Sequence, residues 1–255
     1  MDWRGVKSLL IVAFLLLNIL LAYQLWMDEL NLNKFQENAE KREEIRRLAA
    51  IKEIELEMTI PEQTPQISEV TVKFTEEQEQ TQGNPVTLDN PIESNLIDDI
   101  RQLKTQLKKQ IPQIEEYEID PYALPAEQSK LILNQLYNRI PMFRVQLELI
   151  IEGDLIVAYQ LRHANVLEVK SDEQEPSLQG ENILPAYMAL ISLIETYLPP
   201  GTTVVDMRLG YYGPIFASET QVLAPYWRVT LATGESYYIH AVNGAVEGPP
   251  PSNED

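Results

Sequence analysis

An uncharged apolar stretch near the N-terminus constrains the fold of this chain more than any other feature of its sequence. Residues Ser8–Met27, SLLIVAFLLLNILLAYQLWM, contain no charged side chain. A helix of about 20 residues rises about 30 Å, which matches the hydrocarbon core of a bilayer. The apolar core of a signal peptide is shorter, about 7–15 residues, and small residues follow it at the cleavage site. This stretch ends in bulky residues instead, so it predicts a retained transmembrane helix over residues 8–27.

The residues that flank the stretch predict its orientation. Arg4 and Lys7 precede it, whereas Asp28 and Glu29 follow it. Because basic flanks stay on the cytoplasmic side, residues 1–7 are expected in the cytoplasm and the rest of the chain outside the cell membrane. Basic and aromatic side chains at the two ends of a spanning helix also hold it at the interfaces. The residues predicted to do so are Arg4, Lys7, Tyr23 and Trp26.

One polar residue, Asn18, lies near the middle of the apolar stretch. Spacings of four and three residues place it on one helical stripe, formed by Ile11, Leu15, Asn18, Ala22 and Leu25. An amide at mid-depth gains about 0.6–2 kcal/mol from a partner on a neighbouring helix. A plain anchor with an idle asparagine and a helix that recognises another helix fit these residues equally well. The residues alone leave both interpretations open.

The charge of the chain excludes several classes of partner. It carries 20 basic and 39 acidic residues, a formal net charge of −19. Such a balance repels nucleic acid and anionic lipid headgroups, so neither is an expected partner of the outer part. The chain has no cysteine. Disulfides, thiolate metal sites, a cysteine nucleophile and a lipid-modified cysteine are therefore all absent.

Changes of pattern along the chain divide the outer part. Charged residues with an incomplete helical period predict a solvated helical stalk, ended by Pro61 and Pro65, rather than a coiled coil. A polar stretch, SDEQEPSLQGEN, then separates two lobes, and a proline-rich end is expected to be disordered. The predicted parts are a stalk over 28–60, a first lobe over 61–170, a linker over 171–182, a second lobe over 183–247 and a tail over 248–255.

Both lobes are predicted to combine helices with antiparallel strands. Alternating and helical periods indicate a strand over 70–74, helices over 91–111 and 126–139, and strands over 143–151, 155–162 and 165–170. A turn at Gly153 joins the first two of these last strands. The second lobe reads as a helix over 183–198 and strands over 202–211, 226–232 and 236–241, with a hairpin turn at Gly234. A helix followed by three strands thus recurs, at 126–170 and 183–246. The expected fold class is α+β.

No pattern of residues indicates an active site. The sequence contains none of the nucleotide-binding, hydrolase or metal-binding motifs, and its two imidazoles, His163 and His240, are expected to be structural or surface residues. We therefore predict no catalytic residue, no metal and no cofactor. Aromatic residues crowd the last strands, where most should pack in the core and some could form a partner surface. The candidates for that surface are Tyr211, Tyr212, Tyr226 and Trp227.

Two separate stretches resemble one known family. The start, MDWRGVKSLLIVAFLLLNILLAYQLW, resembles the opening of the YycI (WalI) proteins of Gram-positive bacteria. The segment Leu209–Glu247, LGYYGPIFASETQVLAPYWRVTLATGESYYIHAVNGAVE, resembles the C-terminal unit of the same family. That unit is similar to the PepSY-like module of a helix on a sheet, with Trp227 on a strand and a closing turn at Asn243 and Gly244. The resemblance covers about a quarter of the chain.

The resemblance implies a regulator without enzymatic activity. YycI-type proteins cross the membrane once and act with a YycH-type partner, in a heterodimer or ternary complex. They bind the WalK (YycG) sensor histidine kinase of the WalKR system, which controls cell-wall metabolism. Under this resemblance the stripe around Asn18 would contact the spanning helices of the kinase. A bias of about 1–3 kcal/mol between two signalling states would change kinase output several-fold or more.

Three other interpretations of the chain stay open. It could be a structural single-pass envelope or divisome protein, although such proteins usually carry a long regular heptad pattern after the membrane. It could be an anchored inhibitor of an envelope protease, because PepSY-like modules occur in propeptides. An anchored wall hydrolase ranks last, since no site for the chemistry is visible.

Overall fold

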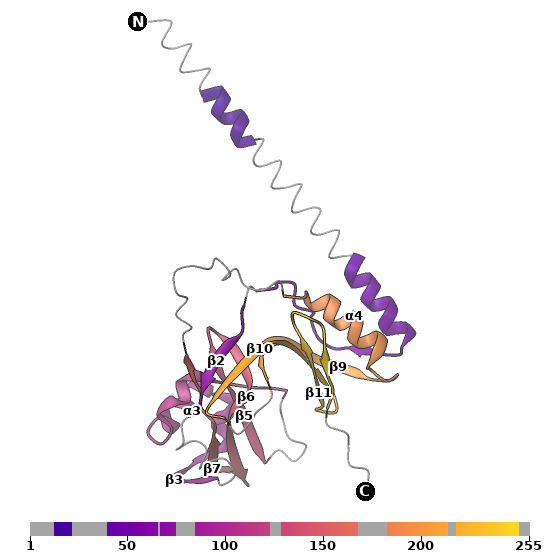
Figure 1. Ribbon diagram of the computed structural model, residues 1–255. Coiled ribbons are helices and arrows are strands. Elements are labelled where there is room, and N and C mark those ends of the chain that lie inside the picture. The colour runs from indigo at the N-terminus through magenta and orange to yellow at the C-terminus, as the bar shows by residue number, and fades with distance from the viewer. Residues whose placement is uncertain are drawn as a thin grey trace, which may run out of the picture. The chain divides into compact units, whose positions relative to one another are not determined.

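Strands dominate the part of the chain that the computed structural model describes, which comprises residues 13–21, 40–65, 67–74, 85–122, 129–167, 183–213 and 218–249. The chain divides into two compact units, residues 1–48 and 49–255. Figure 1 traces the elements in chain order. Helical segments cover residues 13–21 and 40–51, and the two further α-helices are α3 (Ile100–Leu107) and α4 (Ala186–Thr196). Short 3₁₀ helices cover η1 (Ser94–Asp98) and η2 (Pro112–Glu116).

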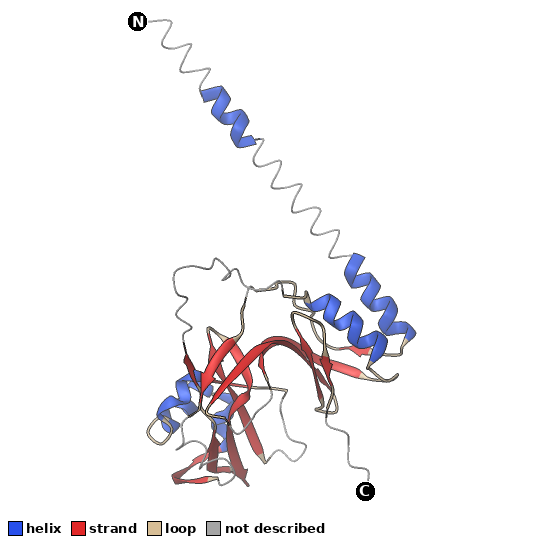
Figure 2. Ribbon diagram, in the orientation of Figure 1, coloured by secondary structure: helices blue, strands red, loops and turns tan. Residues whose placement is uncertain are grey.

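Twelve described strands form a hydrogen-bonded network within residues 49–255. Their bounds are β1 (Glu55–Leu56), β2 (Val70–Lys73), β3 (Val86–Glu93), β4 (Tyr117–Ile119), β5 (Lys130–Tyr137), β6 (Ile140–Glu152), β7 (Leu155–Leu161), β8 (Asn165–Leu167), β9 (Thr203–Tyr212), β10 (Thr220–Leu231), β11 (Ser236–His240) and β12 (Val246–Glu247). The main path runs β12-β11-β10-β9-β6-β5-β4, with β7 beside β6 and β3 beside β7. Most pairs are antiparallel, and β1 joins β9 in parallel. Figure 2 shows the strands and the helices that accompany them.

Two long strands join the parts of this network. The second half of β10 pairs with β9 and β11, while its first half pairs with β2, which in turn pairs with β8. The long β6 pairs with β5 and β7 and meets β9 at Met142 and Tyr211. Gly210 makes this crossing of β6 and β9 fit, because a Cβ atom there would lie 2.4 Å from the Phe143 ring. A side chain at that position would force the strands apart.

The first core lies between α3, η2 and the strands β3, β5, β6 and β7. Its largest fully buried side chains include Tyr117, Leu103, Leu107 and Ile114. Asp99 precedes α3 and its side chain accepts a hydrogen bond from the Gln102 amide, which stabilises the start of the helix. The five apolar residues that define the predicted helix over 91–111 all pack on this core. They are Ile92, Leu96, Ile100, Leu103 and Leu107.

A second set of buried residues lies on α4, on β10, which α4 contacts, and on β11. Ala189, Leu190 and Leu193 of α4 are buried, as are Val229 and Ile239 on the strands. Figure 1 shows α4 alongside the strongly curved β10 and the neighbouring strands. The predicted helix over 183–198 and the strands that follow it are confirmed. So are β2 and the turns at Gly153 and Gly234, where both glycines have positive φ.

The predicted helix over residues 126–139 is wrong, because residues 130–137 form β5. This strand lies between β4 and β6 and buries side chains on both faces. Its apolar residues therefore do not alternate with polar ones, and their spacing resembles a helical period. A two-residue turn of Asn138 and Arg139, both with positive φ, ends it. The repeat of a helix and three strands in the first lobe is therefore also wrong.

The predicted helix over 91–111 is only partly right. Residues 91–93 end β3, and residues 94–98 form η1 before α3 begins at Ile100. The strand β3 keeps its pairing with β7 by an irregular register around Pro91, which cannot donate a ladder hydrogen bond. Side chains spaced at a helical period thus reach the same core from three different elements.

The predicted stalk helix ends at residue 51 instead of at the prolines beyond it. The amide of Ile54 donates to the Ala49 carbonyl at 2.8 Å, and Glu53 has a φ of 56°. These features form a Schellman turn, in which a left-handed residue closes the last helical turn. The backbone then continues into β1, whose hydrogen bonds go to β9 instead of to a further turn of helix.

The α+β class is confirmed. No helix within the described ranges is both long enough and apolar enough to cross a membrane. The predicted spanning helix over 8–27 extends beyond the described residues 13–21 and stays a prediction, as does the PepSY-like character of the second lobe. The predicted linker over 171–182 lies outside the described residues, and so do residues 250–255 of the predicted tail.

Candidate interaction site

Two residues of the predicted helix-contact stripe, Leu15 and Asn18, lie in the described helix over 13–21. The amide nitrogen of Asn18 donates to the Phe14 carbonyl of the same helix at 2.8 Å. This bond leaves the side-chain carbonyl oxygen of Asn18 as an acceptor for another chain. Ile11, Ala22 and Leu25 lie outside the described residues, as do the predicted anchors Arg4, Lys7, Tyr23 and Trp26.

The four aromatic residues predicted as a candidate partner surface are buried in this structure. Tyr211, Tyr212, Tyr226 and Trp227 are 3 %, 4 %, 7 % and 1 % exposed. The indole nitrogen of Trp227 donates to the carbonyl of Leu184, just before α4, at 2.7 Å. These side chains therefore belong to the core and offer a partner little area.

The aromatic residues instead join the strands β9, β10 and β11 to one another. The rings of Tyr212 and Tyr238 stack with centroids 3.9 Å apart, and the Tyr226 ring meets that of Tyr212 edge-on at 5.1 Å. The hydroxyl of Tyr226 donates to the Glu247 carboxylate at 3.0 Å, which holds β12 against the sheet. Burial and the Glu247 charge raise the pKa of Tyr226 to about 12, so this hydroxyl keeps its proton.

A buried ion pair connects the residue after β4 with β10. The side chains of Asp120 and Arg228 are 0 % and 3 % exposed, and the guanidinium donates to both carboxylate oxygens. Asn134 also donates to Asp120, at 2.7 Å. Burial by itself would raise the pKa of Asp120, but the hydrogen bonds and charge of Arg228 lower it overall. The carboxylate is therefore ionised, and the pair fixes β4 to β10 across the sheet.

A groove of about 320 Å³ lies beside this ion pair. Its charged lining residues are of both signs, Glu118 and Asp206 against Arg139 and Arg208. Asp206 accepts two hydrogen bonds from Arg208, at 2.6 and 3.0 Å. Two charged residues of each sign, of which Asp206 and Arg208 are paired with each other, give the groove no net preference for a ligand of either sign.

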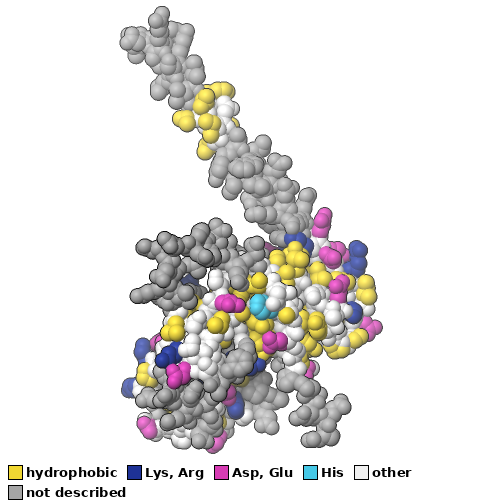
Figure 3. Space-filling model, viewed as in Figure 1, with side chains coloured by type: hydrophobic (Ala, Val, Ile, Leu, Met, Phe, Trp, Pro, Cys, Tyr) yellow, Lys and Arg dark blue, Asp and Glu magenta, His cyan; other side chains and the backbone are white. Residues whose placement is uncertain are grey.

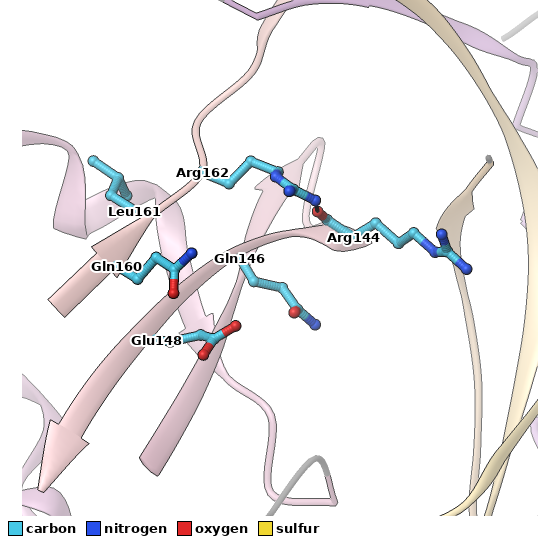
Figure 4. A pocket seen from close by; sticks show the side chains of 6 residues that line it. All are labelled: Arg144, Gln146, Glu148, Gln160, Leu161 and Arg162. Carbon is cyan, nitrogen blue, oxygen red and sulfur yellow. Dashed lines mark hydrogen bonds between the residues drawn. The ribbon is translucent and has the colours of Figure 1, made fainter. Parts of the chain in front are cut away.

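A smaller hollow of about 70 Å³ lies on the face of β6 and β7 that points away from the first core (Figure 4). Side chains two residues apart share a face of a strand, so Arg144, Gln146 and Glu148 of β6 lie together. Gln160 and Arg162 come from β7 and the residue after its end. Arg162 donates to the Arg144 carbonyl at 3.3 Å, which holds its guanidinium above β6.

The electrostatics of this hollow are dominated by its arginines. Burial lowers the pKa of Arg162, the charge of Arg144 lowers it further, and Glu148 opposes both effects. Arg144 also reaches β9, where its guanidinium lies 4.6 Å from the centre of the Tyr212 ring and donates to the Tyr212 hydroxyl. The hollow is thus tied to the aromatic cluster through one side chain.

The two histidines have structural surroundings. The Tyr117 hydroxyl donates to the Arg162 carbonyl at 2.7 Å and lies 3.2 Å from Nδ1 of His163. Since the phenol has one proton, Nδ1 of His163 is the donor in that second contact. Burial lowers the pKa of His163, although Glu116 opposes the shift, so the ring is neutral at pH 7. Nδ1 of His240 accepts the Val242 amide at 3.2 Å.

No metal centre is visible within the described ranges, where no three His, Asp or Glu side chains lie together as ligands. Figure 3 likewise shows basic side chains scattered among apolar and acidic ones over the described part of that face, without a continuous basic patch.

Sequence reasoning missed both the buried ion pair and the arginine hollow. The hollow had a detectable signal, because the predicted strands over 143–151 and 155–162 place Arg144, Gln146 and Glu148, and Gln160 and Arg162, on shared faces. The ion pair had none, since Asp120 and Arg228 are 108 positions apart and only the sheet brings them together.

Comparison with known protein families gives one finding. The family model described as YycI protein matches residues 31–243, which is most of the chain. A comparison with curated proteins gives no match.

Proposed function

Because this chain belongs to the YycI family, we propose that it is a membrane-anchored accessory regulator of the WalK (YycG) sensor histidine kinase. The YycI family is regulatory and not enzymatic. In our proposal the helix over 8–27 crosses the cell membrane of a Gram-positive bacterium once, with residues 1–7 in the cytoplasm. The outer part pairs with a YycH-like protein, and the complex adjusts kinase output on cell-wall genes.

The family match over residues 31–243 is the observation that carries this proposal. It covers nearly all of the chain beyond the apolar stretch, and the role of that stretch as an anchor is part of the proposal. A regulator that is anchored beside a kinase can change its output through small contact energies, because a bias of about 1–3 kcal/mol shifts a two-state equilibrium by about 5- to 150-fold.

The spanning helix is the proposed contact with the kinase, and Asn18 is its most specific residue. The side chain is exposed on the described helix, and its bond to Phe14 uses one amide proton and leaves the oxygen as an acceptor. A hydrogen bond to a neighbouring helix contributes about 0.6–2 kcal/mol in a membrane. Losing it should weaken association with the kinase by about 3- to 30-fold.

The experiment replaces Asn18 with leucine in the full chain and measures co-purification with the kinase and transcription of wall-metabolism genes. A matched control moves the amide, by combining Asn18→Leu with Leu17→Asn, which rotates it about 100° around the helix without changing composition. We expect both variants to lose kinase and to keep the YycH-like partner. If Asn18→Leu retains the kinase fully, and a foreign spanning helix does so too, recognition by the helix is refuted.

A further inference from the structure

The groove beside the buried ion pair is lined by two strand edges that no described strand covers. Ile119 of β4 and Leu209 of β9 both line it. The strand β4 ends the main path and pairs with β5 alone among the described strands. On the edge of β9 away from β10, β1 pairs as far as Val204 and β6 joins at Tyr211. Between these two points no described strand lies beside β9 on that edge.

The backbone of Ile119 faces the open edge of β4. The amide of Asp120 donates to the Ile132 carbonyl on β5, so Ile119, one position earlier, directs its own N–H and C=O away from β5. Its side chain packs against the first core. A strand edge with unpaired N–H and C=O groups is a template on which an extended peptide can add.

The backbone of Leu209 is open in the same way. The Leu231 amide donates to the Glu235 carbonyl on the side of β11. Arg228, three positions earlier on β10, faces the opposite side and pairs there with Arg208 of β9. Leu209 follows Arg208 along β9, so its N–H and C=O are directed away from β10 and toward the uncovered edge.

Two exposed charges of opposite sign also line the groove. Glu118 on β4 and Arg139 in the turn after β5 make no ion pair or hydrogen bond with any described residue. The other two charged residues of the lining, Asp206 and Arg208, are bonded to each other. A ligand with one positive and one negative end therefore matches both free charges, whereas a simple anion or cation matches only one of them.

Arg139 holds its place in the groove at a conformational cost. It has a φ of 66°, and Asn138 before it has a φ of 51°. A two-residue turn of this kind favours glycine at its second position, because a Cβ atom is strained in the left-handed region. No contact of the Arg139 side chain with a described residue compensates for that strain. Strain of this kind is typical of positions where function requires a particular side chain.

The size of the groove limits the ligand. Its volume of about 320 Å³ is at the lower end of the range of about 300–1,000 Å³ for small-molecule sites. Asn134, opposite Glu118, lies five positions before Arg139, which is at most about 17 Å of extended chain. The two charged side chains span part of that distance, so a peptide of about two to three residues fits between their charges.

We propose that the groove binds a short zwitterionic peptide in extended form. Its ammonium group lies at Glu118 and its carboxylate at Arg139. Its main chain forms hydrogen bonds with the open edges of β4 and β9, at Ile119 and Leu209. The charges at the two ends select a peptide of matching length, and the main-chain bonds are independent of its side chains.

The test measures binding of radiolabelled trialanine to the full chain in detergent micelles, by equilibrium dialysis at low ionic strength. N-acetyl-trialanine lacks the ammonium group and trialanine amide lacks the carboxylate, while both keep the main chain. Each should bind about 2- to 5-fold more weakly than trialanine, because exposed ion pairs contribute modestly. If trialanine does not bind saturably, or if either blocked peptide binds as tightly as trialanine, the proposal is overturned.

Variants assign the two ends of the peptide. Glu118→Gln should weaken binding of trialanine by about 2- to 5-fold and leave that of N-acetyl-trialanine unchanged. Arg139→Gly should weaken trialanine binding equally and leave that of trialanine amide unchanged, and it relieves strain in the turn instead of unfolding the protein. The matched controls are Glu152→Gln and Arg101→Gln, which remove exposed charges outside the groove. Equal binding of trialanine by the groove variants and their controls overturns the proposal.

A third peptide tests the pairing with the strand edges. Trialanine with both peptide nitrogens methylated keeps its charged ends and cannot donate main-chain hydrogen bonds from its peptide groups. It should bind about 2- to 10-fold more weakly than trialanine. Binding as tight as that of trialanine would overturn the pairing. None of these readouts involves the kinase, so failure here leaves the proposed function untouched.

Discussion

Removal of the Asp120 carboxylate is the most direct test of how the end of β4 and the strand β10 are held together. Asp120→Ala leaves the Arg228 guanidinium, 3 % exposed, with Asp206 at 3.5 Å as its remaining carboxylate. It also removes the acceptor for Asn134 and for the Tyr122 amide. A charge that stays buried after losing its partner destabilises a fold by about 3–5 kcal/mol.

The expected loss is large enough to measure by thermal or urea unfolding. For a chain of this size, about 3–5 kcal/mol corresponds to a decrease in Tm of about 6–20 °C. Fluorescence of Trp227, which is 1 % exposed, follows the unfolding of β10 itself. Glu118→Ala is the control, because it removes an exposed carboxylate from the adjacent strand β4 and should change stability by about 0.5 kcal/mol or less.

A double variant separates the ion pair from the general effect of losing side chains. Arg228→Met together with Asp120→Ala removes both charges and keeps the bonded pair of Asp206 and Arg208. The double variant should therefore lose clearly less free energy of unfolding than the two single variants lose together. The reasoning would be refuted if the losses of the two single variants simply added in the double variant. It would also be refuted if Asp120→Ala were as stable as Glu118→Ala. The low pKa of Asp120 adds a further expectation: stability from the pair is complete above about pH 3.9 and falls as the pH decreases below it.

Two further predictions concern local strain and titration. Arg139→Gly should raise the free energy of unfolding in urea by about 1 kcal/mol, because Arg139 has a φ of 66° that glycine adopts without strain. Asn138→Gly should raise it by less, because asparagine already tolerates the left-handed region. A destabilised Arg139→Gly variant would contradict this prediction. The lowered pKa of His163 means that the unfolded chain binds more protons as the pH falls below about 6.5, so stability should decrease there. The urea midpoint of wild type should therefore fall between pH 7.5 and 5, and the midpoint of His163→Asn should fall less over the same range. Equal pH dependence of the two midpoints would contradict this prediction.

Patterns within a few residues were sufficient for much of the fold. The strands β2, β6, β7, β9 and β11 and the helix α4 were predictable, because most of them show a strand or helix period in the sequence. The turns at Gly153 and Gly234 were predictable because glycine adopts positive φ without strain. Family membership was also accessible, through the stretches at both ends of the chain.

The turn at Asn138 and Arg139 shows why β5 was misassigned. Both residues have positive φ, yet arginine is an unusual second residue for such a turn, so no glycine marked it. Because the turn was not recognised in the sequence, the apolar residues of β5 were interpreted as one face of a helix. Glu53 hid the end of the stalk helix in the same way, since it occupies a left-handed position where glycine is expected.

The sequence by itself determined the apolar stretch, the acidic balance, the lack of known catalytic motifs and the elements with one buried face, because these depend on composition and on periods of two or 3.6 residues. Only the tertiary structure decided that β5 is a strand and that Asp120 meets Arg228. Each of these depends on neighbours far apart in the chain. Burial on both faces and the desolvation of charges exist only after those neighbours have been assembled.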